Sequence, residues 1–244
     1  MEEYPTLTKA PITEALIDIQ VKLPSTVDAK KIDSIYESIK DKYPEKQEQK
    51  ISEVRFELKE EVVQSSDVKI NGYVYITSDK KQIVQTRLDG FTFSRLHPYV
   101  TWKELHDEAY RLWKIYRDIT SPEAITRVAL RYINNLNIPM PIKDFGDYLT
   151  APPTVPEKLP QGVGGFLTRV VIHESSIGVT AIITQALEQI GTDSAPIIID
   201  IDVFKLQPNG MEENEVWDTI NKIRHFKDKI FFNSITNKLK EMYK

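Results

Sequence analysis

The chain has 244 residues, of which 41% are hydrophobic and 28% are charged, and it contains no cysteine. Its length and composition predict a folded protein with a sizeable core, and the lack of cysteine excludes disulfides, thiolate-bound metals and a cysteine nucleophile. The formal net charge of −4 argues against a nucleic-acid-binding protein, because such proteins usually carry an excess of basic residues.

The hydropathy of the chain bears on where the protein resides. No apolar run approaches the roughly 20 residues that a membrane-spanning helix needs. Residues 1–16 are acidic and lack the apolar region of a signal peptide. We therefore expect a cytoplasmic protein that makes no use of a membrane.

The first half of the chain is predicted to hold a strand, a helix, three strands and a second helix. Residues 14–23 alternate between apolar and polar side chains, which is typical of a half-buried strand. Residues 27–43 place isoleucines at helical spacing and end before a proline. Strand-like runs follow at residues 50–58, 68–77 and 82–96. Asn71-Gly72 predicts a β-bulge in the second run, and residues 78–81 predict a hairpin loop after it.

The clearest local signal is the start of the next helix. Thr101 and Glu104 have the spacing of a capping box, in which each residue satisfies a free backbone N–H of the other. Val100 and Leu105 stand where a hydrophobic staple would place them. The sequence therefore predicts a helix from residue 102 to about 119.

The pattern then restarts. Residues 124–138 predict a long strand, and a proline-rich connection with one short helix at residues 142–149 follows it. Three further strands are predicted at residues 165–174, 177–188 and 196–206. The chain ends in a helix predicted over residues 212–243, because apolar residues keep helical spacing there and no glycine or proline intervenes.

The two halves thus share one order of elements. We interpret them as two β-α-βββ-α repeats, residues 1–122 and 123–244, the second with a proline-rich insertion at residues 139–164 and a long C-terminal helix. The predicted fold class is α+β, with both repeats sharing one curved antiparallel sheet and the helices packed on one face. This layout resembles the saddle of the TATA-binding protein in topology. The alternative is a single irregular α+β domain without a repeat.

Short segments of the chain resemble a known family. They are residues 10–20 (APITEALIDIQ), residues 126–139 (TRVALRYINNLNIP), residues 145–156 and the phenylalanine-containing last helix. They are similar to a sporadically distributed family of uncharacterised prokaryotic proteins, of which the API-E opening and the RYIN segment are most typical. The resemblance implies a prokaryotic, cytoplasmic setting and a shared fold, and it supplies no catalytic residue.

Common catalytic motifs do not occur in the chain. Residues 175–178 lack the first glycine of a nucleophile elbow, so no serine-hydrolase motif is formed. The glycine-rich residues 161–165 lack the lysine of a phosphate loop and precede a strand, not a helix. We therefore expect no catalytic residue, no cofactor and no metal site of a recognisable type.

Carboxylates on the last predicted strand leave two possibilities open. Asp200 and Asp202 point to the same face of a sheet, because side chains alternate along a strand. They can hold a divalent cation with help from a neighbour, or form ion pairs with arginines on adjacent strands. The second possibility is the more ordinary one.

The arginines are distributed unevenly, and this is the most informative feature of the chain. Six of the nine arginines fall on predicted strands, namely Arg55, Arg87, Arg95, Arg127, Arg131 and Arg169. The guanidinium group is suited to carboxylate and phosphate and costs less to bury than an ammonium group. Arg127 and Arg131 are four residues apart and share a face, about 13 Å from each other on a regular strand. Because Ala129 and Ile133 share that face, the side of the sheet to which it belongs is ambiguous.

The sequence therefore predicts a candidate binding site on a polar face of the sheet. Its residues are Arg87, Arg127, Arg131, Arg169, Asp200 and Asp202. The alternative is a lattice of cross-strand ion pairs that binds nothing.

Two functions of different classes follow from this face. The first is a non-enzymatic binding or interaction protein whose partner is an anionic small molecule, another protein or a second copy of the chain. The second is an enzyme that acts on an anionic small molecule through the strand arginines together with Asp200 and Asp202. Nucleic-acid binding, suggested only by the saddle layout, is disfavoured by the acidic charge.

Overall fold

The computed structural model describes the chain except for residues 1–3, 6, 59–61 and 188–190, and for residues 52–58 and 62–68 it describes the backbone only. The predicted facing of side chains at residues 50–58, including Arg55, therefore falls largely outside the described residues. The strands are β1 (Ile12–Lys22), β2 (Glu45–Leu58), β3 (Val62–Ile76), β4 (Gln82–Arg87), β5 (Gly90–Leu96), β6 (Ala124–Pro139), β7 (Phe166–Glu174), β8 (Val179–Leu187) and β9 (Ser194–Met211). The helices are α1 (Ala29–Asp33), α2 (Ile35–Ile39), α3 (Trp102–Thr120), η1 (Phe145–Asp147, a 3₁₀ turn), α4 (Glu213–Ser234) and α5 (Asn237–Met242).

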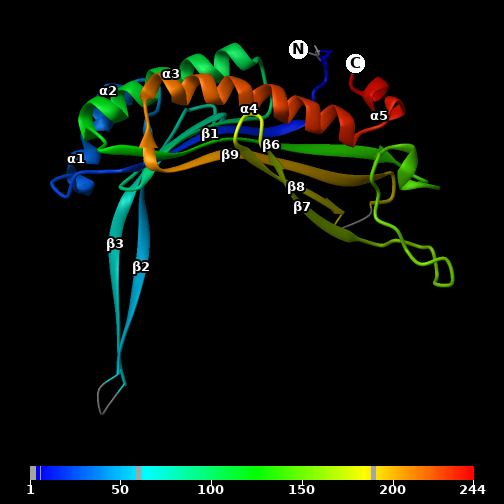
Figure 1. Ribbon diagram of the computed structural model, residues 1–244, viewed down its shortest axis with the longest axis horizontal. Coiled ribbons are helices and arrows are strands. Elements are labelled where there is room, and N and C mark those ends of the chain that lie inside the picture. Colours follow the sequence, from blue (N-terminus) through cyan, green and yellow to red (C-terminus); the bar gives the residue numbers. More distant parts are fainter. Residues whose placement is uncertain (1–3, 6, 59–61, 188–190) are drawn as a thin grey trace.

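All the described strands belong to one antiparallel sheet, which confirms the α+β class. The strand order is β2-β3-β4-β5-β1-β6-β9-β8-β7, and β1 and β6 pair at its middle. Figure 1 shows the sheet below a layer of helices, with α3 above the strands of the first half and α4 above those of the second. The β2–β3 hairpin extends away from this body (Figure 1).

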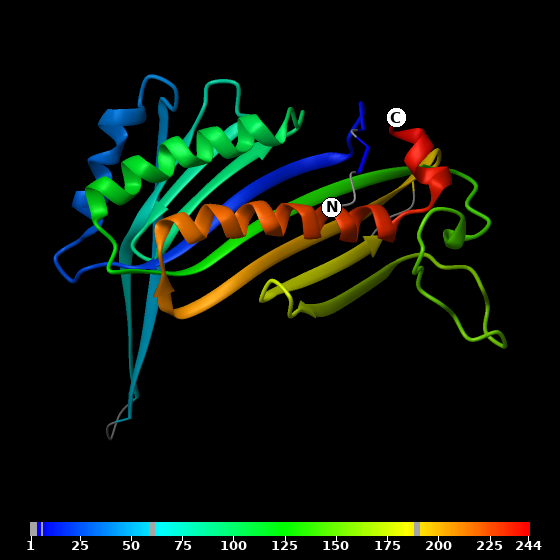
Figure 2. The same cartoon turned by 45° about the horizontal axis from the view of Figure 1, so that its top comes forward.

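The core lies between the sheet and the helices. On β1, Ala15, Ile17 and Ile19 are fully buried because the alternation of the strand turns them toward the helices. Figure 2 shows α3 and α4 running over the central strands while β7 and β8 lie to the side of α4. On the edge strand β7, Leu167 and Val171 are exposed.

The predicted third strand is in fact two strands. Residues 82–96 form β4 and β5, which pair from Arg87 and Gly90 outward and leave a two-residue turn at Leu88 and Asp89. Gly90 follows the turn directly and is the first residue of β5. A Cβ at Gly90 would lie 2.5 Å from the carbonyl oxygen of Ile19 on β1, so the strand after the turn needs glycine there.

Two predicted helices are interrupted. The helix expected over residues 27–43 is divided into α1 and α2 at Ser34, whose hydroxyl donates to the carbonyl of Lys31 at 2.7 Å. The C-terminal helix ends at Ser234, because Ile235 is extended and pairs with Leu149 across an isolated bridge. The bridge at Ile235 is a tertiary contact that helical spacing does not reveal.

Smaller predictions are confirmed or corrected by the backbone. In the β2–β3 register Gln49 pairs with Gly72 and Lys50 with Ile70, so Asn71 is the extra residue of the expected bulge. The loop after β3 also lies where it was predicted, between Ile76 and Gln82. The short helix expected at residues 142–149 is only the 3₁₀ turn η1.

The predicted start of α3 is also found. The Thr101 hydroxyl accepts a hydrogen bond from the backbone N–H of Glu104 at 3.2 Å. Leu105 of the expected staple is buried, whereas Val100 is 45% exposed.

Candidate functional site

The strand arginines of the predicted site lie mostly on the sheet face opposite the helices. Asp18 of β1 accepts from Arg87 of β4 at 3.0 Å and from Arg127 of β6 at 2.8 Å. Arg127 also reaches Asp202 of β9 at 3.2 Å. The Thr92 hydroxyl donates a further hydrogen bond to Asp18 at 2.8 Å.

The neighbouring pair continues this network. Arg131 donates two hydrogen bonds to Asp200, at 2.8 and 2.6 Å, and these bonds raise its pKa. Burial raises the pKa of Asp202, although Arg127 and Arg131 oppose that shift. Arg87, Arg127 and Arg131 thus each have a carboxylate partner, which is the arrangement expected of an ion-pair lattice.

Two other strand arginines lie elsewhere. Arg169 is exposed on the edge strand β7. It pairs in register with Thr184 of β8, which pairs in turn with Asp200 of β9, so strand β8 separates Arg169 from Asp200. Arg95 pairs in register with the buried Ala15, so it lies on the helix-covered side of the sheet and not on the polar face. The structure therefore joins five of the six predicted site residues and leaves Arg169 apart.

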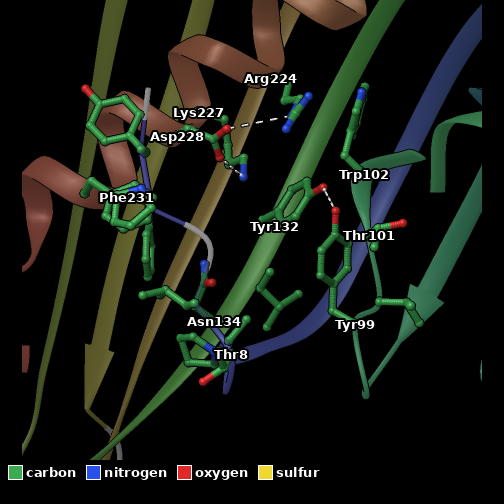
Figure 3. A pocket seen from close by; sticks show the side chains of 18 of the residues that line it. Thr8, Tyr99, Thr101, Trp102, Tyr132, Asn134, Arg224, Lys227, Asp228 and Phe231 are labelled. Carbon is green, nitrogen blue, oxygen red and sulfur yellow. Dashed lines mark hydrogen bonds and ion pairs between the residues drawn. The ribbon is translucent and has the colours of Figure 1, made fainter. Parts of the chain in front are cut away.

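A cavity lined by tyrosines and by charged residues lies on the other face, beneath the helices (Figure 3). It has a volume of about 480 Å³, within the range of about 300–1,000 Å³ that is common for small-molecule sites. Its walls come from the N-terminal segment, the start of α3, the middle of α4 and the central strands β1 and β6. None of the six predicted site residues lines it.

Two tyrosines form part of the cavity wall. Tyr132 of β6 is buried, and its hydroxyl hydrogen-bonds the hydroxyl of Tyr99 at 2.9 Å. The two rings meet edge to face, with centroids 5.5 Å apart. Asn134, two residues further along β6, is 3% exposed and donates to the carbonyl of Ile199 at 3.0 Å. These contacts fix the orientation of the polar groups.

A buried lysine faces the tyrosines from α4. The Nζ of Lys227 lies 3.7 Å from the centroid of the Tyr132 ring and donates to Asp228 at 2.5 Å. Burial lowers the pKa of Lys227, while the Asp228 carboxylate acts in the opposite direction. Figure 3 shows Lys227, Asp228 and Arg224 together on α4, facing Tyr132.

Two cationic side chains face one carboxylate at this wall of the cavity. Arg224 lies one turn before Asp228, with its Nε 3.8 Å from that carboxylate, and its guanidinium group is 5.2 Å from the Trp102 ring centroid. Arg224 and Lys227 therefore share a single carboxylate. Among the cavity-lining residues that the structure describes, Asp228 is the only acidic one.

The N-terminus of α3 opens toward the same cavity. Thr101, Trp102 and Lys103 line it, and they are the N-cap and first two residues of a 19-residue helix. The helix dipole adds positive potential at that end. Together with Arg224 and Lys227, it makes the cavity suited to a negatively charged group.

The motifs of the sequence did not indicate this cavity, although one residue pattern on α4 points to it. Ile223, Lys227 and Phe231 are four residues apart, so a lysine occupies an inward position of α4. A cation on the apolar face of a helix needs a partner, and that need could have singled out Lys227. The API and RYIN segments also meet here, since Pro11 accepts from the N–H of Asn135 at 2.8 Å.

A second cavity, of about 500 Å³, lies on the other side of α4. Its charged residues balance, with Glu174 and Asp218 beside Lys222 and Lys229. Asp218 and both lysines are exposed. An open groove of balanced charge gives no preference for a ligand class.

The comparisons and the composition of the site give no further assignment. No protein-family model matches the chain, and a search of the curated proteins finds no match either. Within the described residues no three histidine or acidic side chains come together as a metal-binding group. Among the helices that the structure describes, none combines the length and apolar character required to cross a bilayer.

Proposed function

We propose that the protein binds an anionic small molecule in the cavity between α3 and α4. The observation that carries this proposal is that Arg224 and Lys227 share the single carboxylate of Asp228 at the wall of a cavity of about 480 Å³. A bound carboxylate or phosphate would complete the charge balance there. Arg224 is suited to orient such a group, because its planar fork binds two oxygens at once.

The remaining walls suit the rest of such a ligand. Phe231, Leu7 and Ile12 provide apolar surface, while the tyrosine hydroxyls and the N-terminus of α3 provide polar contacts. This mixture of many apolar and few polar groups is typical of sites for small organic molecules.

The charged face of the sheet is the competing location. There the arginines already bind carboxylates of the same chain, so a ligand would have to displace Asp18 or Asp200. Breaking such half-buried pairs costs free energy. Binding in the α3–α4 cavity does not require this step, because Arg224 lies 3.8 Å from the carboxylate of Asp228. We therefore place both binding and any reaction on an anionic substrate in the cavity.

The two locations are distinguished by a matched pair of variants. Carboxylates and phosphate monoesters are screened by thermal shift, and those that raise the melting temperature are titrated by calorimetry against the wild type, Arg224→Gln and Arg131→Gln. We expect Arg224→Gln to weaken binding about 10–100-fold, as loss of a charged hydrogen bond does, and Arg131→Gln to leave it unchanged. The opposite result, with binding lost only in Arg131→Gln, would assign the site to the sheet face.

We also propose that the two halves are an internal repeat with the saddle layout. The order of elements around the central pair supports this, since β5 lies beside β1 as β9 lies beside β6. In each half a long helix, α3 or α4, follows the last strand, and both helices lie on the same side of the sheet. The cavity then lies where the halves meet. Superposition of residues 14–119 on residues 124–243 in an experimental structure tests the repeat, and strands that fail to align would contradict it.

A further inference from the structure

Lys227 differs from the other lysine that lines the cavity. Its side chain is 9% exposed, whereas that of Lys103 is 85% exposed and pairs with Asp107 at 2.5 Å. Lys227 therefore offers an amine to the cavity interior, and Lys103 offers one to solvent at the rim. A buried amine beside a binding cavity is a possible nucleophile as well as a charge.

We propose that Lys227 forms a reversible imine with a carbonyl group of the ligand, so that the protein takes an anionic aldehyde or ketone. This inference rests on the proposed function and adds the chemical class of the ligand. Arg224, one turn earlier on α4, holds the anionic group while Lys227 reacts with the carbonyl carbon (Figure 3).

The surroundings of Lys227 allow its amine to lose a proton. Burial disfavours the charged form and lowers the pKa of Lys227, which increases the fraction of neutral amine. Asp228, at 2.5 Å from Nζ, is placed to accept the proton that the ammonium group releases.

The reaction balances without any oxidant or reductant. The lone pair of the neutral Nζ forms a bond to the carbonyl carbon, the π pair of the C=O bond moves to the oxygen, and one of the two Nζ protons passes to that oxygen to give a carbinolamine. The second Nζ proton passes to the hydroxyl as the C–O bond breaks, so that the oxygen leaves as water and a neutral C=N bond remains. Protonation of the imine restores a positive charge, and the face of the Tyr132 ring at 3.7 Å stabilises it as it does the ammonium group.

The experiment uses the full chain with pyridoxal 5′-phosphate as the probe, because it combines an aldehyde, an aromatic ring and a phosphate. Cyanoborohydride reduces any imine to a stable amine, and peptide mass spectrometry locates the label over time. We expect Lys227 to be labelled faster than Lys103, because burial lowers the pKa of Lys227, whereas the hydrogen bond to Asp107 raises the pKa of the exposed Lys103 and reduces its fraction of neutral amine. Lys227→Arg, which keeps the charge, should lose this label, and Lys103→Arg should keep it.

A second probe separates failure of the imine from failure of the proposed function. Pyridoxine 5′-phosphate has the same ring and phosphate but an alcohol in place of the aldehyde. If both compounds bind by calorimetry and Lys227 is labelled no faster than Lys103, the binding site stands and the imine is wrong. If neither compound binds, both proposals are wrong for ligands of this class. A thermal melt of each variant confirms that it is folded.

Discussion

Asp18 is the residue on which the network of the open sheet face depends. It accepts from Arg87, Arg127 and Thr92, and its side chain is only 14% exposed. Removing it leaves two arginines, each less than one-fifth exposed, with a single carboxylate partner each. The pairs are therefore worth more than pairs of fully exposed groups.

We expect Asp18→Ala to lower the free energy of unfolding by about 1–3 kcal/mol, because it leaves half-buried charge incompletely paired. Urea denaturation at neutral pH measures the change. Asp107→Ala is the control, since Asp107 is 54% exposed in its pair with Lys103 and its loss should leave the free energy of unfolding nearly unchanged. Equal losses in the two variants would contradict the special role of Asp18.

Glu108 gives the stability a predictable dependence on pH. Burial favours its neutral form, yet hydrogen bonds from Arg111, Tyr43 and Lys42 outweigh burial and lower its pKa to about 2. A carboxylate with a lowered pKa stabilises the fold above its ordinary value of 4.5, and this contribution is lost as the pH falls toward 2.

Glu108→Gln should therefore unfold more easily than the wild type at neutral pH, by about 2–3 kcal/mol, and the difference should shrink between pH 4.5 and 2. Urea denaturation at several pH values measures this difference. A gap between the two proteins that stays constant over this range would show that Glu108 does not carry the effect.

At the scale of single elements, the hydroxyl of Thr101 determines how α3 begins. It satisfies the N–H of Glu104, and α3 then runs to Thr120. Thr101→Ala should lower the free energy of unfolding by about 0.5–2 kcal/mol. Denaturant melts measure it, with Thr8→Ala as a control at the same cavity but outside any helix. An unchanged midpoint and slope would mean that α3 does not depend on this cap.

The elements that could be predicted from sequence are those with a local cause. Alternation along Ile12–Lys22 and the cap at Thr101 act within a few residues, and both are found. The break at Ile235 could not be predicted in the same way. At Ile235 the helix ends because the residue pairs with Leu149, 86 positions earlier.

The candidate site could also be predicted from the sequence only where the cause is local. Its walls combine residues around 8, 100, 132 and 227, which the fold alone brings together. Strand periodicity predicted that Arg127 shares a face with Arg131 and Asp200 with Asp202, because such periodicity is local. It left open which side of the sheet the two arginines occupy, and the ion pairs to Asp202 and Asp200 show that it is the same side as the two aspartates. Lys227 could be recognised only by asking what a charge does at an inward helical position.

At the scale of the whole molecule, the sheet and its core are continuous. β1 of the first half pairs with β6 of the second, and one apolar cluster includes residues under both α3 and α4. Neither half can then unfold without exposing an edge and a core face of the other. Scanning calorimetry should show one transition whose van't Hoff enthalpy equals the calorimetric enthalpy. Two resolved transitions would contradict this coupling.

The pairing of β1 with β6 also matters while the chain is being made. When Leu96 has been synthesised, β1 can pair with β5, but its other edge waits for β6, which ends at Pro139. At roughly 5–20 residues per second the ribosome needs about 2–9 s for this stretch. During that interval a nascent half-sheet presents an unpaired central strand of alternating apolar residues, which another nascent chain can join. Chaperone demand in this protein should therefore be greatest before the second half emerges.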